Sequence, residues 1–370
     1  MKIEKIVLRK MKMVLKTPFK TSFAEMKEKH FTLAEVHTKD FVGYGDCSAF
    51  PFPYYSEETN ATAWHIMEDF LIPLLYSKDV ISHPEEVHSL FSHIRRNKMA
   101  KAALDCAVWD LYAKERSIPL SKALGGTREQ IETGVSIGVQ KSPDDLLRVI
   151  ENHLEEGYRR IKIKIMPGKD IAYVEAVRKR FGDITLMADA NSAYTLSDID
   201  LFREMDQMNL LMIEQPLSHD DIVDHAKLQR VMKTPICLDE SIHSVDDARK
   251  AIELGSTKTI NIKVGRVGGL TEARKIHDLC ESHGIPVWCG GMLDTGIGRA
   301  HNIAIATLPN YRFPGDIPAS DRYWNEDFVT PQVTISRDSM VQVPAKPGIG
   351  FDPVPELLDR FTYDKKEFVR

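Results

Sequence analysis

Five charged residues recur at almost constant intervals through the middle of the chain, and this spacing restricts the fold more than any other feature. They are Lys164, Asp189, Glu214, Asp239 and Lys263, at intervals of 25, 25, 25 and 24 residues. One strand, loop and return helix of a βα barrel takes roughly 30 residues. A charge that repeats near this interval therefore occupies the same height on successive strands. Five neighbouring strands would direct two cations and three carboxylates into one cavity.

The segments around these charges are typical of buried parallel strands. Short apolar runs, several rich in Ile and Leu, lie at 160–165, 186–191, 211–216, 236–241 and 260–265. Helical patterns separate them, at 170–180, 197–205, 220–231, 244–254 and 271–282, with Ser197, Asp220 and Ser244 as predicted N-caps. Further strands are predicted at 131–138, 286–291 and 313–317. This alternation predicts an α/β protein with a parallel sheet.

The rest of the chain predicts a second domain. At 370 residues the chain exceeds the roughly 250 residues of one α/β barrel. Segments 2–16 and 31–47, the latter with a turn near 39–43, resemble an antiparallel meander, and helices are predicted at 57–76, 83–94 and 99–116. We therefore expect a first domain at 1–127, a barrel domain at 128–320, and a segment at 321–370 that packs back on the first domain.

Composition and charge disfavour several classes of function. The formal net charge is −5 and there is no polybasic run, so neither a nucleic-acid partner nor an anionic membrane is expected. Charges are mixed throughout residues 1–50, which predicts neither a signal peptide nor a membrane span and favours a cytoplasmic protein. The five cysteines form no C-x-x-C pair, and we expect reduced, mostly buried thiols rather than disulfides or a zinc site.

Three carboxylates converging from adjacent strands favour a hard divalent cation. Asp189, Glu214 and Asp239 have no cysteine or histidine among them, so the set suits Mg²⁺ rather than Zn²⁺. A lysine with an ordinary pKa of about 10.4 is protonated at pH 7 and cannot act as a base. Lys162, on the same strand face as Lys164, supplies a like charge that lowers its neighbour's pKa. The arrangement suits proton abstraction beside a carboxylate, with a metal stabilising the enediolate.

The same residues lie in motifs that resemble the enolase superfamily, and within it the muconate lactonizing group. The motifs are Lys162-x-Lys164, Asp189-x-Asn191, Glu214-Gln215-Pro216, Asp239-Glu240-Ser241 and Asn261-x-Lys263. A Lys or His base combined with Mg²⁺ is an established property of that superfamily. The resemblance implies a modified TIM barrel of the (β/α)7β type with an α+β capping domain. It also implies that the three carboxylates bind Mg²⁺, with Mn²⁺ as a possible substitute, and that Lys164 and Lys263 face each other across the substrate α-carbon.

Further segments narrow the resemblance to one family of Gram-positive bacterial enzymes. Residues 50–59, 109–111, 123–127 and 288–296 are similar to o-succinylbenzoate synthases, a family that also includes N-succinylamino acid racemases. The resemblance implies a Mg-dependent lyase that dehydrates 2-succinyl-6-hydroxy-2,4-cyclohexadiene-1-carboxylate in menaquinone biosynthesis. Racemisation of N-succinylamino acids, alone or in addition, is the alternative. In dehydration Lys164 would remove the α-proton, and in racemisation the opposite lysine would return it. We expect a homo-oligomer that acts on a small-molecule carboxylate.

Other members of the superfamily fit the sequence less well. Mandelate-racemase-like enzymes use a His/Asp dyad on the sixth and seventh strands, where this chain has Lys263 and residues 289–291, and a packing or surface role is expected for His301. Dipeptide epimerases carry Asp-x-Asp at the eighth strand, and segment 315–318 lacks the second acid. Muconate cycloisomerases share the lysines and are disfavoured by the loop similarities alone. Two non-enzymatic interpretations remain. A leucine-rich repeat protein is disfavoured because its sequence signature is missing, and a non-catalytic barrel that only binds ligands is the stronger of the two.

Loops of the predicted cap are expected to cover the substrate. Aromatic segments 19–23 and 50–55 suit an apolar ring and a succinyl arm and would exclude water, although packing of the cap explains half of them equally well. A guanidinium at Arg266 would lower the pKa of Lys263, the alternative being an ion pair with a barrel acid. The expected substrate contacts are Phe19, Tyr55, Ser136, Asn191, Gly291, Met292 and Leu293, with Arg266 and Glu240 supporting the site from behind.

Overall fold

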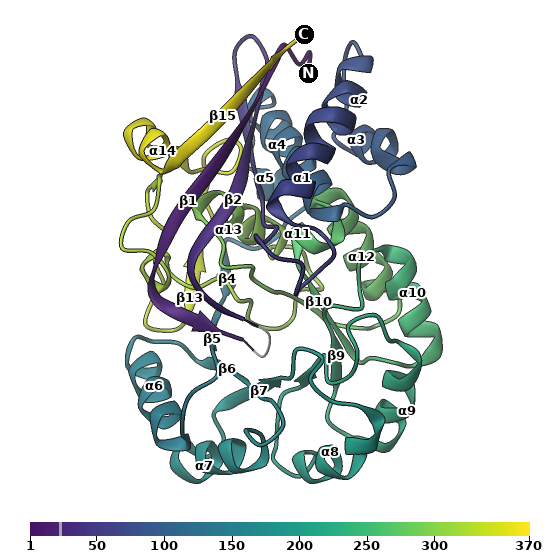
Figure 1. Ribbon diagram of the computed structural model, residues 1–370, viewed down its shortest axis with the longest axis vertical. Coiled ribbons are helices and arrows are strands. Elements are labelled where there is room, and N and C mark those ends of the chain that lie inside the picture. Colours follow the sequence, from purple (N-terminus) through teal and green to yellow (C-terminus); the bar gives the residue numbers. More distant parts are fainter. Residues whose placement is uncertain (22–23) are drawn as a thin grey trace.

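The apolar runs in the second half of the chain form one parallel sheet in the computed structural model, which describes residues 1–21 and 24–370 (Figure 1). Part of segment 19–23, expected over the site, thus lies outside the described residues. Neighbours along the sheet follow the order of the sequence. The strands are β5 (Gly134–Ile137), β6 (Arg160–Lys164), β7 (Thr185–Asp189), β8 (Ile213–Glu214), β9 (Ile236–Leu238), β10 (Thr259–Ile262) and β11 (Val287–Cys289).

An irregular segment closes this sheet into a barrel. The amide of Asp316 donates to Cys289 O of β11 (2.8 Å), and the amide of Gly134 in β5 donates to Gly315 O (2.8 Å). The predicted strand at 313–317 is therefore in the expected place, but it is not a regular strand. Pro314 has no amide to donate and interrupts the ladder. The result is the modified (β/α)7β barrel.

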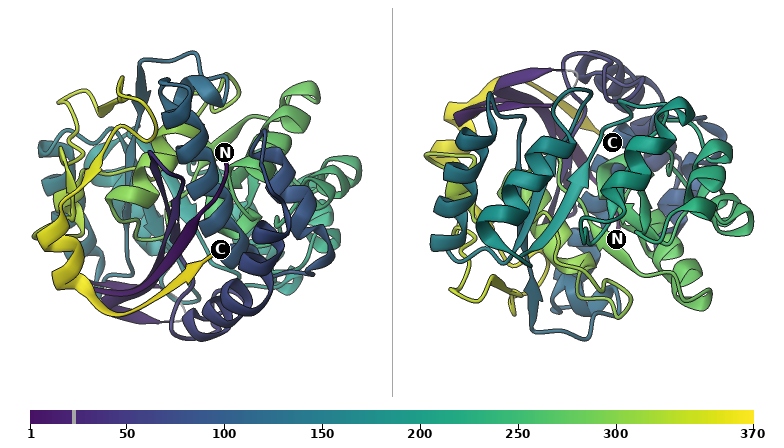
Figure 2. Two further views of the ribbon diagram at one scale, coloured as in Figure 1. Left: turned by 90° about the horizontal axis from the view of Figure 1, so that it is seen from above. Right: turned by 90° about the horizontal axis from the view of Figure 1, so that it is seen from below.

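Helices lie around the outside of the barrel strands in Figure 1, and the view from below shows them again on the outer side of the strands (Figure 2). Ser244 accepts a hydrogen bond from Asp247 N and begins α10 as predicted. The other two N-caps were misplaced: Thr195, not Ser197, caps the turn before α8, and Asp221, not Asp220, accepts the first amides of α9. The helices are α6 (Pro143–Glu155), α7 (Ile171–Phe181), α8 (Ile199–Met205) after the 3₁₀ turn Leu196–Asp198, α9 (Val223–Val231), α10 (Val245–Leu254), α11 (Val264–Val267), α12 (Leu270–Ser282) and α13 (Gly296–Ile305).

The N-terminal meander is a four-stranded antiparallel sheet that includes the end of the chain. Its order is β15-β1-β2-β3, and β15 pairs with β1 from Lys5 opposite Val369 onwards, so the yellow strand lies beside the purple ones in Figure 1. The strands are β1 (Lys5–Lys20), β2 (Glu25–His37), β3 (Val42–Cys47) and β15 (Thr362–Val369). The division of the chain after residues 127 and 320 stays a prediction.

Helices between this sheet and the barrel follow the predicted pattern with one change. The helix predicted at 57–76 begins only after the N-cap Thr59 and contains a π turn at Met67–Leu71. Pro73 cannot donate an amide to the preceding turn, so regular α bonding is interrupted there. The other helices are α1 (Asn60–Ile66), α2 (Ile72–Ser77), α3 (Glu85–Leu90) with the 3₁₀ turn Phe91–His93, α4 (Lys98–Glu115) and α5 (Leu120–Ala123).

The C-terminal segment contains only short elements. One of them, β13, pairs antiparallel with β4 at the start of the barrel region. No helix among the described residues is long and apolar enough to cross a membrane. The elements are β4 (Gln130–Glu132), the 3₁₀ turn Ser320–Arg322, β12 (Val329–Thr330), β13 (Met340–Gln342), β14 (Asp352–Pro353) and α14 (Pro355–Phe361).

Helix α4 is buried between the N-terminal sheet and the barrel. Its small residues are buried, as expected for core packing, and Trp109 donates its indole N–H to Thr271 of α12 (2.9 Å). His301 of α13 is also buried and its ring nitrogens lie 2.9 Å from Ile297 O and 3.3 Å from Cys106 O, which is a packing role. All five cysteines are buried and free of disulfides.

The close approach of β3 to α4 depends on glycine. A methyl group on Gly45 would overlap the carbonyl oxygen of Ala103. We therefore expect Gly45→Ala to lower the free energy of unfolding by about 1–3 kcal/mol, the usual cost of overpacking, as measured by urea denaturation. Gly265→Ala is the matched control, because a methyl group there only reaches ordinary contact with Ser48. Equal stability of the two variants would show that the sheet moves away from α4 without cost.

Candidate functional site

The five evenly spaced charges meet at the carboxyl ends of the barrel strands. Lys164, Asp189 and Glu214 are the last residues of β6, β7 and β8, and the strand register places them side by side. Asp239 and Lys263 directly follow β9 and β10. The side chains of all five are buried. The structure thus brings together the residues that the spacing singled out.

Each of the two lysines proposed as bases lies against a carboxylate. Lys164 Nζ is 2.5 Å from Asp189 Oδ2, and Lys263 Nζ is 2.7 Å from Asp239 Oδ2. Lys263 also donates to the hydroxyl of Tyr55 (3.1 Å), which comes from the loop between the sheet and α1. A lysine therefore lies on each side of the three consecutive carboxylates at the mouth of the barrel.

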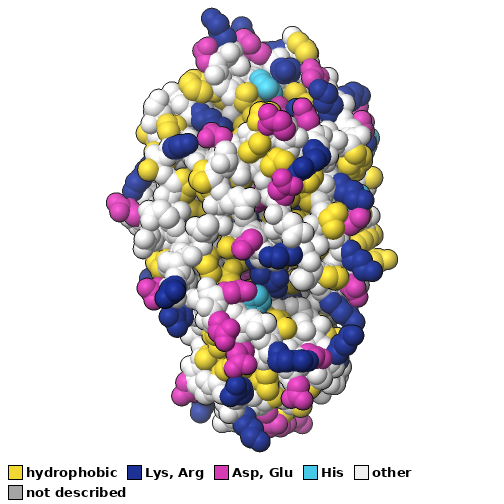
Figure 3. All heavy atoms as spheres, turned by 90° about the vertical axis from the view of Figure 1, so that its left-hand side faces the viewer, with side chains coloured by type: hydrophobic (Ala, Val, Ile, Leu, Met, Phe, Trp, Pro, Cys, Tyr) yellow, Lys and Arg dark blue, Asp and Glu magenta, His cyan; other side chains and the backbone are white. Residues whose placement is uncertain are grey.

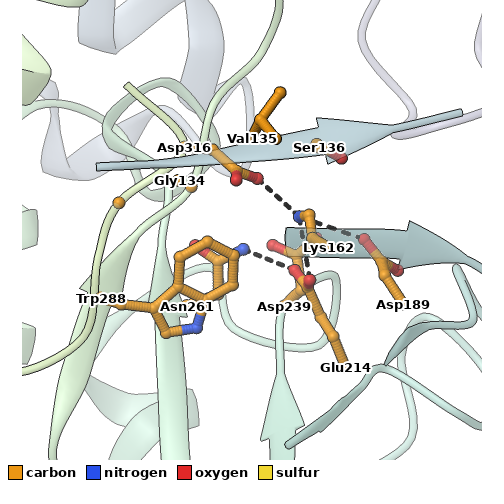
Figure 4. Close-up of polar contacts among 12 residues, drawn as sticks. Gly134, Val135, Ser136, Lys162, Asp189, Glu214, Asp239, Asn261, Trp288 and Asp316 are labelled. Atoms are coloured by element: carbon orange, nitrogen blue, oxygen red, sulfur yellow. Dashed lines mark hydrogen bonds and ion pairs between the residues drawn. The ribbon is translucent and has the colours of Figure 1, made fainter. Parts of the chain in front are cut away.

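Lys162 occupies the centre of the carboxylate cluster (Figure 4). Its ammonium lies 3.0 Å from Glu214 Oε2, 3.3 Å from Asp189 Oδ2 and 2.6 Å from Asp316 Oδ2. Arg160, two residues earlier on the same strand face, pairs with the other oxygen of Asp316 at 2.7 Å. The expected effect of Lys162 on the pKa of Lys164 stays a prediction. The structure adds that three carboxylates surround the ammonium of Lys162.

Burial and neighbouring charges shift the protonation equilibria of the cluster. Burial, followed by the charge of Asp189, raises the pKa of Glu214. Burial opposes ionisation of Asp189 too, but Lys164 and Lys162 hold the pKa of that carboxyl below its ordinary value. Burial would lower the pKa of Lys162, yet Asp316, Glu214 and Asp189 together raise it. The carboxylates therefore hold the proton on this lysine.

Amide side chains orient the carboxylates from behind. Asn261 donates to Glu214 Oε1 (2.6 Å), and Asn191 donates to Glu240 Oε1 (2.9 Å) through its side chain and to Asp189 Oδ1 (3.0 Å) through its backbone. Gln215 accepts the amide of Asp239 (2.9 Å). Asn261 and Gln215 were visible in the motifs, but the contacts they make could not be inferred from spacing.

Arg266 differs from its sequence-based interpretation. Its guanidinium pairs with Asp239 Oδ1 and donates to the carbonyls of Ile242 (2.8 Å) and Asn261 (2.6 Å). The pKa of Lys263 is raised rather than lowered, because Tyr55 and nearby carboxylates outweigh burial. The expected lowering effect of Arg266 on this pKa stays a prediction. The alternative, an ion pair with a barrel acid, describes the contact.

The donor set suits a divalent cation, although the carboxylates are held apart by lysines. Asp189, Glu214 and Asp239 are completely buried and offer only oxygen, the preference of Mg²⁺. No set of oxygens from these three carboxylates lies mutually within 4.8 Å. Among the described residues, His277, Asp278 and Glu281 form the one group of three possible metal ligands whose ligand atoms do. Two of those three are exposed on α12. Asp189 and Asp239 are instead each paired with a lysine, Lys164 and Lys263.

The predicted substrate contacts line one small cavity above the cluster. Phe19, Tyr55, Ser136, Asn191 and residues 291–293 surround a space of about 60 Å³ together with Lys162, Lys164 and Lys263. Sequence reasoning missed further lining residues. Tyr323 comes from the C-terminal segment, which carries no motif, and Asp316 was noted only as an incomplete epimerase signature. Met26 was also missed, whereas Thr21 and Phe50 lie within the segments 19–23 and 50–55 that were expected to cover the substrate.

Comparisons with known proteins agree with this arrangement. Residues 145–357 match the family described as enolase C-terminal domain-like, and residues 2–125 match the N-terminal domain of mandelate racemase and muconate lactonizing enzymes. An o-succinylbenzoate synthase from Geobacillus kaustophilus is 56% identical over 369 residues, 100% of this chain and 98% of the relative. An N-succinylamino acid racemase from Thermus thermophilus is 45% identical over 362 residues, 98% of each chain. A solved enolase-superfamily member from Listeria innocua has a TM-score of 0.96 at 46% identity, covering 100% of this chain and 99% of that one.

The buried ion pair of Arg160 provides a test of how the cluster is held. Arg160→Met leaves Asp316 with one cation fewer in the barrel interior, and removing one partner of a buried pair typically costs about 3–5 kcal/mol. We expect a loss of that size in the free energy of unfolding, measured by urea denaturation. Arg159→Met is the control, because the neighbouring side chain is exposed and lies 3.7 Å from the exposed Asp338. A loss no larger than that of the control would mean that Lys162 alone neutralises Asp316.

Proposed function

The chain belongs to the mandelate racemase and muconate lactonizing enzymes of the enolase superfamily, and on this basis we propose that it catalyses the o-succinylbenzoate synthase reaction. In this reaction 2-succinyl-6-hydroxy-2,4-cyclohexadiene-1-carboxylate loses water to give 2-succinylbenzoate, a step of menaquinone biosynthesis. Relatives named for this activity are 52–56% identical over nearly the whole chain. The observation that carries the proposal is that Lys164 and Lys263 line one cavity, each paired with a buried carboxylate.

The geometry of the barrel explains why these two lysines face each other. With segment 313–317 counted as the eighth wall element, β6 and β10 are four positions apart in a ring of eight. They are therefore diametrically opposed, and a substrate carbon between them would be open to a base on either face. We assign Lys164 as the base that removes the α-proton. The electron pair left behind expels the hydroxide and completes the aromatic ring.

The carboxylates would hold the cation that this chemistry needs. We propose Asp189, Glu214 and Asp239 as ligands of Mg²⁺, with Mn²⁺ as a possible substitute. When bound, the cation supplies the positive charge that stabilises the enediolate and favours loss of the proton from nearby lysines. Lys162 adds a fixed charge beside Glu214, and its raised pKa keeps it protonated. It would therefore serve as an electrostatic partner of the enediolate.

Racemisation of N-succinylamino acids is the second candidate function. It requires a second acid/base group on the opposite face of the α-carbon. We assign this role to Lys263, whose Nζ is held by Asp239 and the hydroxyl of Tyr55. The relative from Thermus thermophilus that carries this name is 45% identical. Dehydration needs only one base, so the presence of Lys263 favours capacity for both reactions.

Several further expectations belong to this proposal. The lining residues Phe19, Tyr55, Ser136, Asn191 and 291–293 would contact the substrate, and Arg266 and Glu240 would support Asp239 and Asn191. We propose a capping domain at residues 1–127, a catalytic barrel at 128–320 and a returning segment at 321–370. A cytoplasmic homo-oligomer without nucleic-acid or membrane partners accords with the mixed surface charge and the sequence composition.

A direct assay tests the proposal. Purified protein with Mg²⁺ is supplied with the cyclohexadiene substrate, and separately, in D₂O, with several N-succinylamino acids. Formation of 2-succinylbenzoate is followed by absorbance, and exchange of the α-proton is followed by NMR. Turnover of the first substrate supports the synthase assignment, and exchange with inversion supports the racemase. Turnover of neither would leave the barrel as a binding module.

Metal dependence is expected to rest on Glu214. Glu214→Gln keeps the shape of the side chain but removes one anionic ligand, so Mg²⁺ affinity and turnover should fall together, with kcat/KM reduced at least about 100-fold. Calorimetric titration with Mg²⁺ and the synthase assay measure the two effects. Glu175→Gln on the exposed face of α7 is the control. Full activity of Glu214→Gln in the presence of a chelator would contradict the metal assignment.

The two lysines should separate the two reactions. Lys164→Ala is expected to abolish dehydration and racemisation, because the general base is lost; a base of this kind commonly contributes about 10²–10⁴-fold. Lys263→Ala should abolish racemisation but spare part of the dehydration, since only its charge is missing there. Exchange rates of L- and D-substrates in D₂O report each face separately. Retention of L-substrate exchange in Lys164→Ala with loss of D-substrate exchange would reverse the assignment of the faces.

A further inference from the structure

A second, larger cavity lies beside the candidate active site. It has a volume of about 770 Å³ and is formed by the end of β1, the loop after β5, α6 and residues of the C-terminal segment. The inner cavity above the lysines measures only about 60 Å³. Pockets that bury small-molecule ligands usually measure roughly 300–1,000 Å³. A substrate with a ring and an extended arm therefore needs more room than the inner cavity offers.

The walls of the outer cavity carry cations without carboxylate partners. Among residues 1–21 and 24–370, no carboxylate lies within 4.0 Å of Lys16, Lys20 or Arg322. The Nε atom of Arg322 is buried and has no hydrogen-bond partner. Of the two acids in the wall, Glu156 is engaged by His153 (2.7 Å) and Asp321 is exposed. In the space-filling view of this face, lysine and arginine side chains lie near a histidine at the hollow, with acidic side chains also beside it (Figure 3).

Arg322 lies at the boundary between the two cavities. It donates through Nη2 to the carbonyl of Ser136 (3.3 Å). Ser136 lines the inner cavity and pairs with Lys162 on the neighbouring strand β6. The next residue, Tyr323, lines the inner cavity and packs edge to face on Phe19, with ring centroids 6.3 Å apart. Phe19 lines both cavities. A ligand at the lysines that extends past Phe19 would therefore meet Arg322.

The dimensions agree with a short dicarboxylate. Adjacent strands are about 4.8 Å apart, so a group bound beside Ser136 on β5 is one or two such spacings, roughly 5–10 Å, from the ends of the β6 lysines. A succinyl arm, with two methylenes between its carbonyl and its carboxylate, spans roughly 5 Å when extended, at about 1.5 Å per carbon–carbon bond. Apolar side chains such as Val139 and Val333 in the outer cavity suit the methylenes.

We propose that Arg322 binds the distal carboxylate of the substrate's succinyl arm, which runs from the lysine pair past Phe19 into the outer cavity. The inference rests on the proposed function and names the residue that selects succinyl substrates over those without a second carboxylate. A guanidinium with an unused buried N–H can receive a carboxylate with two hydrogen bonds. Lys16 and Lys20 add positive charge at the outer rim and attract the dianion.

The test compares ligands with and without the distal carboxylate. Proton exchange in D₂O is measured for an N-succinylamino acid and for its N-acetyl analogue, with wild type, Arg322→Gln and Arg322→Lys. For Arg322→Gln we expect kcat/KM with the succinyl substrate to fall roughly 10- to 100-fold, because a charge-assisted contact is lost. With the acetyl substrate kcat/KM should remain nearly unchanged. Arg322→Lys should restore part of the difference. Arg159→Gln, an exposed residue at the opposite end of β6, is the control.

A binding measurement keeps the proposal testable if turnover is absent. Calorimetry with 2-succinylbenzoate and with 2-acetylbenzoate, in the presence of Mg²⁺, should show that Arg322→Gln weakens only the first ligand. An equal loss for both ligands or both substrates would make Arg322 structural, and no loss for either would exclude the outer cavity from recognition. Both results overturn the inference while leaving the synthase assignment intact. Absence of both turnover and binding in the wild type would overturn the proposed function and the inference together.

Discussion

The pairing of buried opposite charges at the mouth of the barrel is the interaction on which the rest of the site depends. A carboxylate or ammonium removed from water costs several kcal/mol unless an opposite charge lies close by. The cluster meets this condition with five acids and five bases, so that it is neutral when all ten are charged. The acids are Asp189, Glu214, Asp239, Glu240 and Asp316, and the bases are Arg160, Lys162, Lys164, Lys263 and Arg266.

This charge balance also affects which groups of the cluster can release or accept a proton. A neutral arrangement has no surplus of positive charge to hold an enediolate, and the pKa of Lys162 and that of Lys263 are raised by the surrounding acids. Adding a divalent cation to such a cluster shifts its balance to the positive side, which favours anions and the neutral form of a lysine. The same residues thus stabilise the fold as ion pairs and offer a base once that balance changes.

The second domain limits access of water to these charges. Tyr55 reaches Lys263 from a loop in which Glu58 accepts the amides of Met99 (2.8 Å) and Ala100 (3.1 Å) at the start of α4. Because α4 packs on the barrel, the loop over the site is attached to the barrel as well as to the N-terminal sheet. The pairing of β15 with β1 ties the end of the chain to this same sheet.

Much of the fold could be predicted because it follows from local patterns. The apolar runs, their spacing and the alternation with helical segments depend on neighbouring residues alone, and most of the predicted strands and helices appear at the predicted places. Errors arose where one residue decided between adjacent alternatives. Thr195 caps the turn before α8 and Asp221 accepts the first amides of α9, each within two residues of the predicted cap. Pro73 and Pro314 break regular bonding by lacking an amide.

By itself the sequence determined which residues would share the barrel mouth, since a side chain at a constant interval on successive parallel strands must occupy one level. Only the tertiary structure decided how these charges pair. The ion pair of Arg266 with Asp239, and that of Lys162 with Asp316, each join side chains from distant parts of the chain. The paired residues are about 25 to 150 positions apart in the sequence. The outer cavity and Arg322 are likewise products of packing between segments that share no local pattern. Electrostatic contacts of this kind act through space, and no spacing along the chain encodes them.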